Sequence, residues 1–206
     1  MGTIRHHEHD LPDLAHYDVD AIAIDTETLG LNPHRDRLCV VQISPGDGSA
    51  DVIRIAKGQK KAPNLVRLLK DRSITKIFHF ARFDLAMLQH ALDVMPEPVF
   101  CTKIASRLTR TYTDRHGLKD IAAELLDVQL SKQQQSSDWG ATALSAAQLE
   151  YAASDVLYLH RLREVLAGRL EREGRAATAA ACFRFLPTRA RLDLMGWAEE
   201  DIFAHS

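Results

Sequence analysis

The chain has 206 residues, of which 46% are hydrophobic and 26% charged, and its formal net charge is −2. This length fits one domain that buries its own core, and the composition is that of an ordinary globular protein. No apolar run approaches the ~20 residues of a membrane span, and the near-neutral charge argues against a broad basic surface for long duplexes. The polar start and three distant cysteines, Cys39, Cys101 and Cys182, predict a cytoplasmic protein without disulfides or membrane contact.

The first part of the chain predicts strands joined by short turns. A short strand is expected over residues 3–7 and a helical turn over 10–16. The apolar segments 21–25, 38–44 and 50–55 have the length and composition of further strands. Their connections contain Gly, Asn and Pro, which favour tight turns and therefore an antiparallel meander.

The following part predicts helices around one more strand. Pro63 begins a helix through Leu69, because the missing N–H of proline is harmless in the first turn. Residues 74–80 form a predicted strand and 81–92 a predicted helix. Helices are also expected over 117–126 and, as one long element with Ser145 as N-cap, over 145–170. The order predicts an α/β fold with a mixed sheet flanked by helices.

The remaining tail is Ala-rich and is expected to break at Pro187. It contains a cluster of apolar residues: Leu192, Leu194, Met195, Trp197, Ile202 and Phe203. Exposed, such a cluster would form a patch typical of interfaces. We therefore expect a single domain over residues 1–206, with homo-oligomer contacts at about residues 187–206.

Two carboxylates mark the end of the strand over 21–25. Asp25 and Glu27 lie two residues apart, so both side chains leave the same face of the strand. Paired carboxylates are hard-oxygen ligands suited to magnesium or manganese. An ordinary pair of surface acids on a half-exposed strand is the alternative.

Three further residues belong to helices that come later in the chain. Asp84 lies near the start of the helix over 81–92, where an acid also fits the helix dipole. Tyr151 and Asp155 are spaced i, i+4 and hence share one helix face, as a hydrogen-bonded pair would. Gathered acids repel one another unless a divalent cation joins them or their pKa values rise.

Taken together, these segments resemble the three motifs of the DEDD exonuclease superfamily in its tyrosine-bearing branch. Asp25 and Glu27 match D-x-E, and Tyr151 with Asp155 matches Y-A-x-x-D. The second motif is matched by His79, Ala81, Phe83 and Asp84, and the segment 130–155 resembles ribonuclease D. The resemblance covers about residues 21–170 and implies an RNase H-like fold.

The resemblance implies a 3′-5′ exonuclease that uses two divalent cations, Mg²⁺ or Mn²⁺. If the roles of the matching family residues apply here, Asp25, Glu27, Asp84 and Asp155 would hold the cations, and Tyr151 would orient the attacking water. Neighbouring residues are expected to contact the substrate: Thr26, Thr28, Leu29, Leu31, His79, Phe83 and Gln135. Leu31 matches the apolar wedge of the oligoribonuclease family, although a buried turn residue fits as well. His79 could instead pack in the core, and Lys132 and Gln135 could simply belong to a polar connector.

In length and in its stretch 30–42 the chain is most similar to the stand-alone nanoRNase C family. That resemblance implies hydrolysis of short single-stranded RNA, down to dinucleotides, to nucleoside 5′-monophosphates. It also implies a homo-oligomer, with an octamer as the expected state. Trimming of longer RNA, as in ribonuclease D, and DNA exonuclease activity are the alternatives, and a non-catalytic RNA-binding module is the third.

Overall fold

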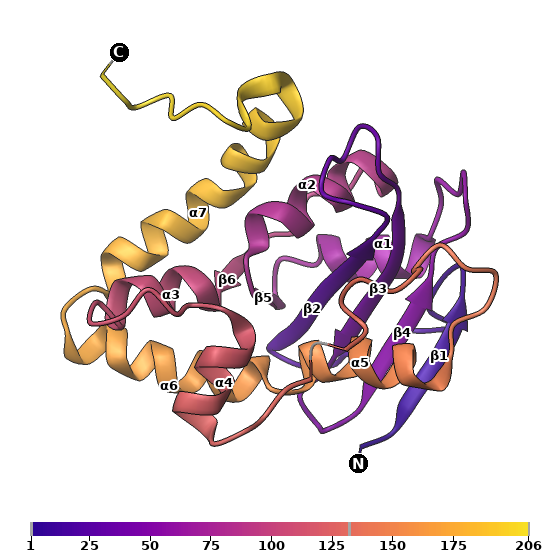
Figure 1. Cartoon of the computed structure of the whole chain (residues 1–206), viewed down its shortest axis with the longest axis horizontal. Helices are drawn as coiled ribbons and strands as arrows, with labels where there is room; N and C mark the ends of the chain where they lie inside the picture. The colour runs from indigo at the N-terminus through magenta and orange to yellow at the C-terminus, as the bar shows by residue number, and fades with distance from the viewer. Residues whose placement is uncertain (1, 132, 206) are drawn as a thin grey trace.

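The computed structural model describes residues 2–131 and 133–205, and its centre is one mixed β-sheet (Figure 1). The strand order in the sheet is β1-β4-β3-β2-β5-β6. The strands β2, β3 and β4 pair antiparallel, whereas the pairs β1–β4, β2–β5 and β5–β6 are parallel. The strands are β1 (Ile4–Glu8), β2 (Ala21–Thr28), β3 (Leu38–Ser44), β4 (Ala50–Arg54), β5 (Thr75–Phe78) and β6 (Val99–Cys101).

Helices cover this sheet and extend beyond one of its edges (Figure 1). The α5 helix packs against β1 to β4, α6 packs against α3 and α4, and α7 packs against α2 and β6. The helices are α1 (Pro63–Lys70), α2 (Ala81–Leu92), α3 (Thr102–Thr109), α4 (Leu118–Leu126), α5 (Ala146–Leu157), α6 (Leu159–Arg172), α7 (Ala176–Leu192) and a π-helical turn, η1 (Asp193–Trp197). The predicted α/β class, with a mixed sheet flanked by helices, is confirmed.

The register of the sheet sorts the core onto two faces. Alternate residues of a strand point to opposite faces, and paired residues of neighbouring strands share a face. Asp25 is paired with Gln42, and Gln42 with Val52, so these three side chains share one face. Val52 packs there with Ala152 of α5 in the smaller apolar cluster. The larger cluster fills the other face and the space beneath the remaining helices.

Three of the predicted elements are wrong in detail. The long helix over 145–170 is two helices, because the backbone is distorted at Tyr158, whose φ of −105° and ψ of −5° lie at the edge of the right-handed helical region. Pro187 does not end α7 but lies buried inside it, where packing outweighs the missing hydrogen bond. Residues 10–16 contain only turns and bends. Ser145 does cap α5, through a reciprocal capping box with Gln148.

The strand before α2 also ends earlier than predicted. β5 stops at Phe78, and Phe80 adopts a left-handed backbone conformation, φ 68° and ψ 43°, as the N-cap of α2. Left-handed geometry is uncommon for a residue other than glycine. This corner turns the chain sharply from the sheet into the helix that carries Asp84.

The C-terminal turn is tied to α2. Asp193 accepts hydrogen bonds from Arg82 Nε at 2.6 Å and from Arg189 Nε at 2.9 Å. His34 Nε2 lies 3.0 Å from the carbonyl oxygen of Leu194, which connects the same turn to the loop after β2. The turn therefore contacts two segments that are far away in the sequence.

All three cysteines are free thiols, as expected. Within residues 2–131 and 133–205, no helix combines the length and apolar character needed to cross a bilayer.

Core packing around α2 predicts a matched pair of stability effects. Leu85 is fully buried beside Asp84, whereas the side chain of Leu31 is 81% exposed. We expect Leu85→Ala to lower the free energy of unfolding by about 2–5 kcal/mol and Leu31→Ala by less than about 0.5 kcal/mol. Urea denaturation followed by circular dichroism measures both, and similar losses for the two variants would contradict this packing.

Candidate active site

The strand β2 brings two acidic side chains to the face that α5 covers. Asp25 and Glu27 are separated by one residue and point the same way, and β2 is bordered by β3 and β5 on its two sides. Gln42 of β3 is fully buried, and its Nε2 donates a hydrogen bond of 2.8 Å to Asp25 Oδ2. Sequence reasoning missed Gln42, although a lone amide inside the apolar segment LCVVQIS was a usable signal.

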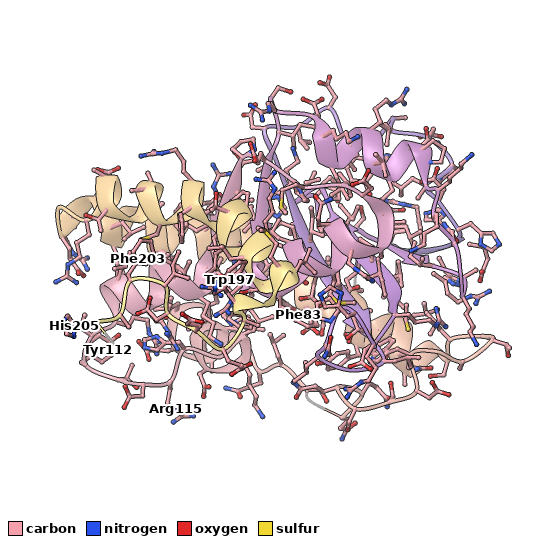
Figure 2. All side chains as sticks on the ribbon, turned by 90° about the horizontal axis from the view of Figure 1, so that it is seen from above. Phe83, Tyr112, Arg115, Trp197, Phe203 and His205 are labelled. Carbon is pink, nitrogen blue, oxygen red and sulfur yellow. The ribbon has the colours of Figure 1, made fainter. Side chains whose placement is uncertain are left out.

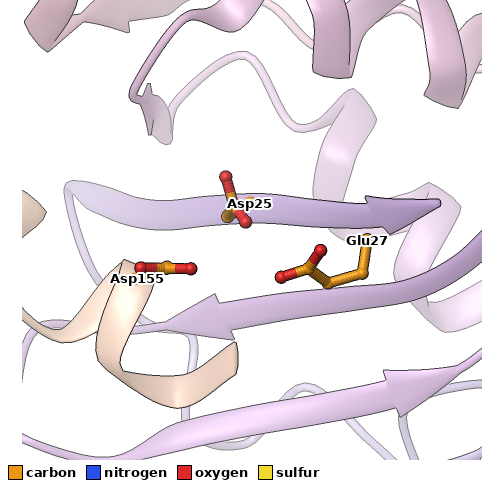
Figure 3. Close-up of side chains that lie close together, drawn as sticks. All are labelled: Asp25, Glu27 and Asp155. Atoms are coloured by element: carbon orange, nitrogen blue, oxygen red, sulfur yellow. The ribbon is translucent and has the colours of Figure 1, made fainter. Parts of the chain in front are cut away.

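The helix α5 supplies the third acid. Asp155 lies opposite Asp25 and Glu27, and Figure 3 shows the three carboxyl groups facing one another. One oxygen from each of the three groups lies within 4.8 Å of the other two. The structure thus brings together residues that are about 130 positions apart in the chain.

Asp84 stands beside this cluster from α2. Its side chain is only 3% exposed, and Thr26 Oγ1 donates a hydrogen bond of 2.7 Å to Asp84 Oδ1. The Thr26 side chain is therefore engaged with a carboxylate, which fixes how α2 sits against β2. Asp84 is outside the mutual 4.8 Å grouping of the other three acids.

The electrostatics of the cluster are unfavourable without a cation. Burial, and then repulsion from Asp84, Asp155 and Glu27, raises the pKa of Asp25 well above its ordinary value. Burial and repulsion from Asp155 likewise raise the pKa of Glu27, and burial raises the pKa of Asp84 and Asp155. Among the described residues, no Lys, Arg or His forms an ion pair with Asp25, Glu27 or Asp155.

The donor set therefore fits divalent cations. Hard carboxylate oxygens converge from two elements, and no ion pair within residues 2–131 and 133–205 neutralises them. Asp25, Glu27 and Asp155 would hold a cation between them, and the neighbouring Asp84 extends the set.

Tyr151 completes the α5 side of the site. Burial, and then the charges of Asp155, Glu27 and Asp25, raise the pKa of its hydroxyl. The group consequently stays protonated at neutral pH and can donate a hydrogen bond. Its ring lies 6.0 Å from that of Trp139, which is buried in the smaller cluster.

A cavity of about 320 Å³ opens onto these groups. Thr26, His79 and Gln135, three residues expected to contact the substrate, line it. His79 Nδ1 is 2.9 Å from Thr102 Oγ1, and burial lowers the pKa of the imidazole to about 3, so this ring is neutral. Sequence reasoning missed several other lining residues, namely Phe80, Lys103, Leu118, Lys119, Leu130 and Ser131.

The other residues expected to contact the substrate lie farther out. Leu29 and Leu31 are exposed on the segment after β2 and do not line the cavity. Thr28 Oγ1 donates to the carbonyl of Gly30 at 2.6 Å, which shapes that segment. Phe83 is partly buried against the larger core cluster. Lys132 lies outside the described residues.

Comparison with known proteins decides the class of this site. The sequence model of a 3′-5′ exonuclease family matches residues 10–171. The chain belongs to this 3′-5′ exonuclease family. The predicted enzyme class and the resemblance to ribonuclease D and nanoRNase C are thereby confirmed, and the acidic cluster fits the divalent cations that this family is expected to use.

Individual relatives of this exonuclease are similar to different extents. Ribonuclease D of Gluconacetobacter diazotrophicus is 36% identical over 154 residues, which are 75% of this chain and 39% of that protein. The chain thus spans about two fifths of the length of such curated relatives. NrnC of Brucella melitensis with bound Mg²⁺ is 77% identical, with a TM-score of 0.96 over 99% of this chain and all of that one. The same protein bound to pGG has a TM-score of 0.98 over the full length of both chains, at 77% identity.

The buried acids make stability depend on pH and metal. Raised pKa values mean that the folded chain holds protons that the unfolded chain has released, so metal-free stability falls as pH rises from about 4 toward 9. Added Mg²⁺ should raise the melting temperature at pH 8 more than at pH 6, because protons compete with the cation. Thermal scans with EDTA or Mg²⁺ measure this, and a metal-independent curve would contradict the site.

One substitution separates stability from metal binding. Asp155→Asn removes a repelling charge but keeps an oxygen acceptor, so we expect the metal-free fold to gain about 1–3 kcal/mol at pH 8. The Mg²⁺-dependent gain should shrink at the same time. Glu150→Gln is the matched control, since Glu150 is an exposed acid of the same helix. Equal responses of the two variants would argue against a shared cation.

Proposed function

We propose that this exonuclease hydrolyses short single-stranded oligoribonucleotides, down to dinucleotides, from the 3′ end. The cluster of Asp25, Glu27 and Asp155 at the floor of a confined cavity carries the proposal. The near-identical fold of Brucella melitensis NrnC, which binds pGG, supports a substrate of two nucleotides. A cavity of about 320 Å³ suits a small ligand better than a long polymer.

The reaction is the addition of water to a phosphodiester. The water oxygen bonds to phosphorus, the bond from phosphorus to the 3′ oxygen breaks, and the 3′ oxygen leaves with a proton. The products are a nucleoside 5′-monophosphate and a strand shortened by one nucleotide.

Asp25, Glu27, Asp84 and Asp155 hold two divalent cations in this proposal. When bound, such cations stabilise the charge on the attacking and leaving oxygens. The protonated hydroxyl of Tyr151 orients the attacking water by hydrogen bonding, since its raised pKa keeps it from acting as a base at neutral pH. Gln42 holds the Asp25 carboxylate in its rotamer.

Further residues contact the bases and sugars of the substrate in this proposal. Leu31, which is 81% exposed, acts as an apolar wedge against the bases, and sequence-tolerant stacking of this kind suits a general scavenger. Leu29, Thr28 and the half-buried Phe83 are further substrate contacts in this proposal, and Gln135 contacts the substrate from the lining of the cavity.

Loss of one carboxylate tests the chemistry. Asp25→Ala should reduce Mg²⁺-dependent release of mononucleotides from end-labelled RNA by at least about a thousandfold, because it removes a central carboxylate of the set that would hold the cations, the one to which Gln42 donates. Asp71→Ala, at an exposed turn, is the control. Activity retained by Asp25→Ala would place the chemistry elsewhere.

Substrate length separates the proposal from ribonuclease D-like trimming and from DNA exonuclease activity. A diribonucleotide should be turned over at least about tenfold faster than a ten-nucleotide RNA or a dideoxynucleotide. Faster hydrolysis of the longer RNA would favour trimming, and a preference for DNA would favour the other alternative.

We further propose that the chain forms a homo-oligomer, with an octamer as the expected state, through the segment 187–206. Met195 is 66% exposed and Phe203 75% exposed, and Trp197 is partly exposed nearby. Figure 2 shows Trp197, Phe203 and His205 on the segment that follows α7. Apolar side chains this exposed are typical of an interface.

Surface substitutions test the assembly without deleting the turn that contacts α2. Met195→Ser combined with Phe203→Ser should lower the molar mass measured by light scattering to that of smaller species, because the apolar contact is lost. Leu31→Ser, an equally polar change outside the tail, should leave the mass as it was. An unchanged mass for the double variant would reject the tail as the interface.

A further inference from the structure

Gln42 is a buried amide that contacts the acidic cluster from β3. Its side chain is fully buried, and its Nε2 donates to Asp25 Oδ2 over 2.8 Å. Asp25 and Gln42 are paired in the antiparallel register, and Val40, two residues before Gln42, is paired with Glu27. The Gln42 side chain therefore lies on the same face of the sheet as both carboxylates of β2.

The amide acts on both of these carboxylates. Burial, and then repulsion from Asp155, raises the pKa of Glu27, whereas hydrogen bonding from the Gln42 side chain lowers it. A primary amide carries two N–H donors on one nitrogen, so a single Nε2 can serve Asp25 and Glu27 together. Gln42 is thus a neutral donor that two mutually repelling acids share.

The other end of this amide has no such role. Oε1 of Gln42 is buried without a hydrogen-bond partner among residues 2–131 and 133–205. An unpaired buried carbonyl oxygen costs stability, and Val52, which is paired with Gln42 in the sheet, belongs to an apolar cluster. A side chain needed only for packing would be apolar here. The donors of the amide, not its packing, therefore explain its presence.

The neutrality of Gln42 matters for a cation. A lysine or arginine at this position would pair with the acids, and a glutamate would add a further repelling charge. An amide orients the carboxylates without neutralising them, as outer hydrogen bonds commonly do for metal ligands. Ligands held in one geometry favour Mg²⁺, which requires near-ideal octahedral coordination, over Ca²⁺, which accepts more ligands in flexible geometry.

We propose that Gln42 is a positioning residue that sets the affinity of the acidic cluster for cations and its preference for Mg²⁺ over Ca²⁺. Its single amide nitrogen donates to Asp25 and Glu27 and fixes the separation and rotation of the two carboxyl groups. The inference rests on the cation chemistry of the proposed function. It concerns a residue that does not line the catalytic cavity and therefore acts through the acids.

Calorimetric titration of the full chain with Mg²⁺ and with Ca²⁺, without substrate, tests this role. Gln42→Met keeps the length of the side chain but removes both donors. Its Kd for Mg²⁺ should rise about 10- to 100-fold and its Kd for Ca²⁺ by less than about threefold. In dinucleotide hydrolysis, the Mg²⁺ concentration for half-maximal rate should rise similarly. The kcat at saturating Mg²⁺ should stay within about fivefold, because a bound cation itself orders the carboxylates.

Two further variants separate this role from general damage. Ser44→Ala removes another buried hydrogen bond of β3, from Ser44 Oγ to the carbonyl of Ser49 at 2.7 Å, at a position paired with Ala23. It should lower the melting temperature and leave both dissociation constants within about twofold, because it touches no acid of the cluster. Gln42→Asn carries an amide that is one methylene shorter, so it should weaken Mg²⁺ binding even where Gln42→Met does not fold.

Other outcomes overturn the inference. Unchanged Mg²⁺ affinity in a folded Gln42→Met or Gln42→Asn protein would show that the amide does not position the cation ligands. Equal losses of Mg²⁺ and Ca²⁺ affinity would show that it does not set the preference between them. Both results would leave the proposed function intact. If the unmodified protein binds no Mg²⁺, the proposed function and the role of Gln42 fail together.

Discussion

Repulsion among half-buried carboxylates is the constraint on which the rest of this structure depends. Asp25, Glu27 and Asp155 share one face with their oxygens within 4.8 Å, and the described residues place no cationic side chain against them. A fold gains nothing from such an arrangement in the absence of a ligand, because burial and mutual charge both oppose ionisation. The unfavourable electrostatic free energy of the cluster must therefore be offset by other interactions, and burial of the large apolar core supplies them.

A few specific contacts hold the acidic side chains in position. The antiparallel register places Gln42 opposite Asp25, and the hydroxyl of Thr26 reaches from the other face of β2 to Asp84. On α5, the reciprocal capping of Ser145 and Gln148 fixes the start of the helix that presents Asp155. Asp25 and Asp84 are thus oriented by neutral donors and Asp155 by its capped helix, and the negative charge of the site remains available for a cation.

Local signals in the sequence predicted the fold class, whereas the acidic residues were singled out by the resemblance of their three motifs to an exonuclease family, because each pair alone also fits an ordinary surface or helix pair. Asp25 and Glu27 follow an apolar strand, and Tyr151 and Asp155 repeat at helical spacing. What sequence reasoning missed depends on tertiary contacts. Lys103 and Phe80 come together only because the β5–α2 corner meets α3, and the break at Tyr158 interrupts a stretch whose apolar spacing suits one helix. Pro187 inside α7 shows packing overriding a strong local signal.

The Asp193 contacts have a consequence for how the chain can vary. Arg82 is two positions before Asp84. The carboxylate of Asp193, which accepts a hydrogen bond from Arg82, therefore also restrains the helical turn that carries Asp84. His34 attaches the loop carrying Leu31 to the carbonyl of Leu194. The loop that carries Leu31 and the first turn of α2 therefore share a single anchor near the C-terminus. A change in that peripheral turn acts on both segments at once, as a change in an interior contact would.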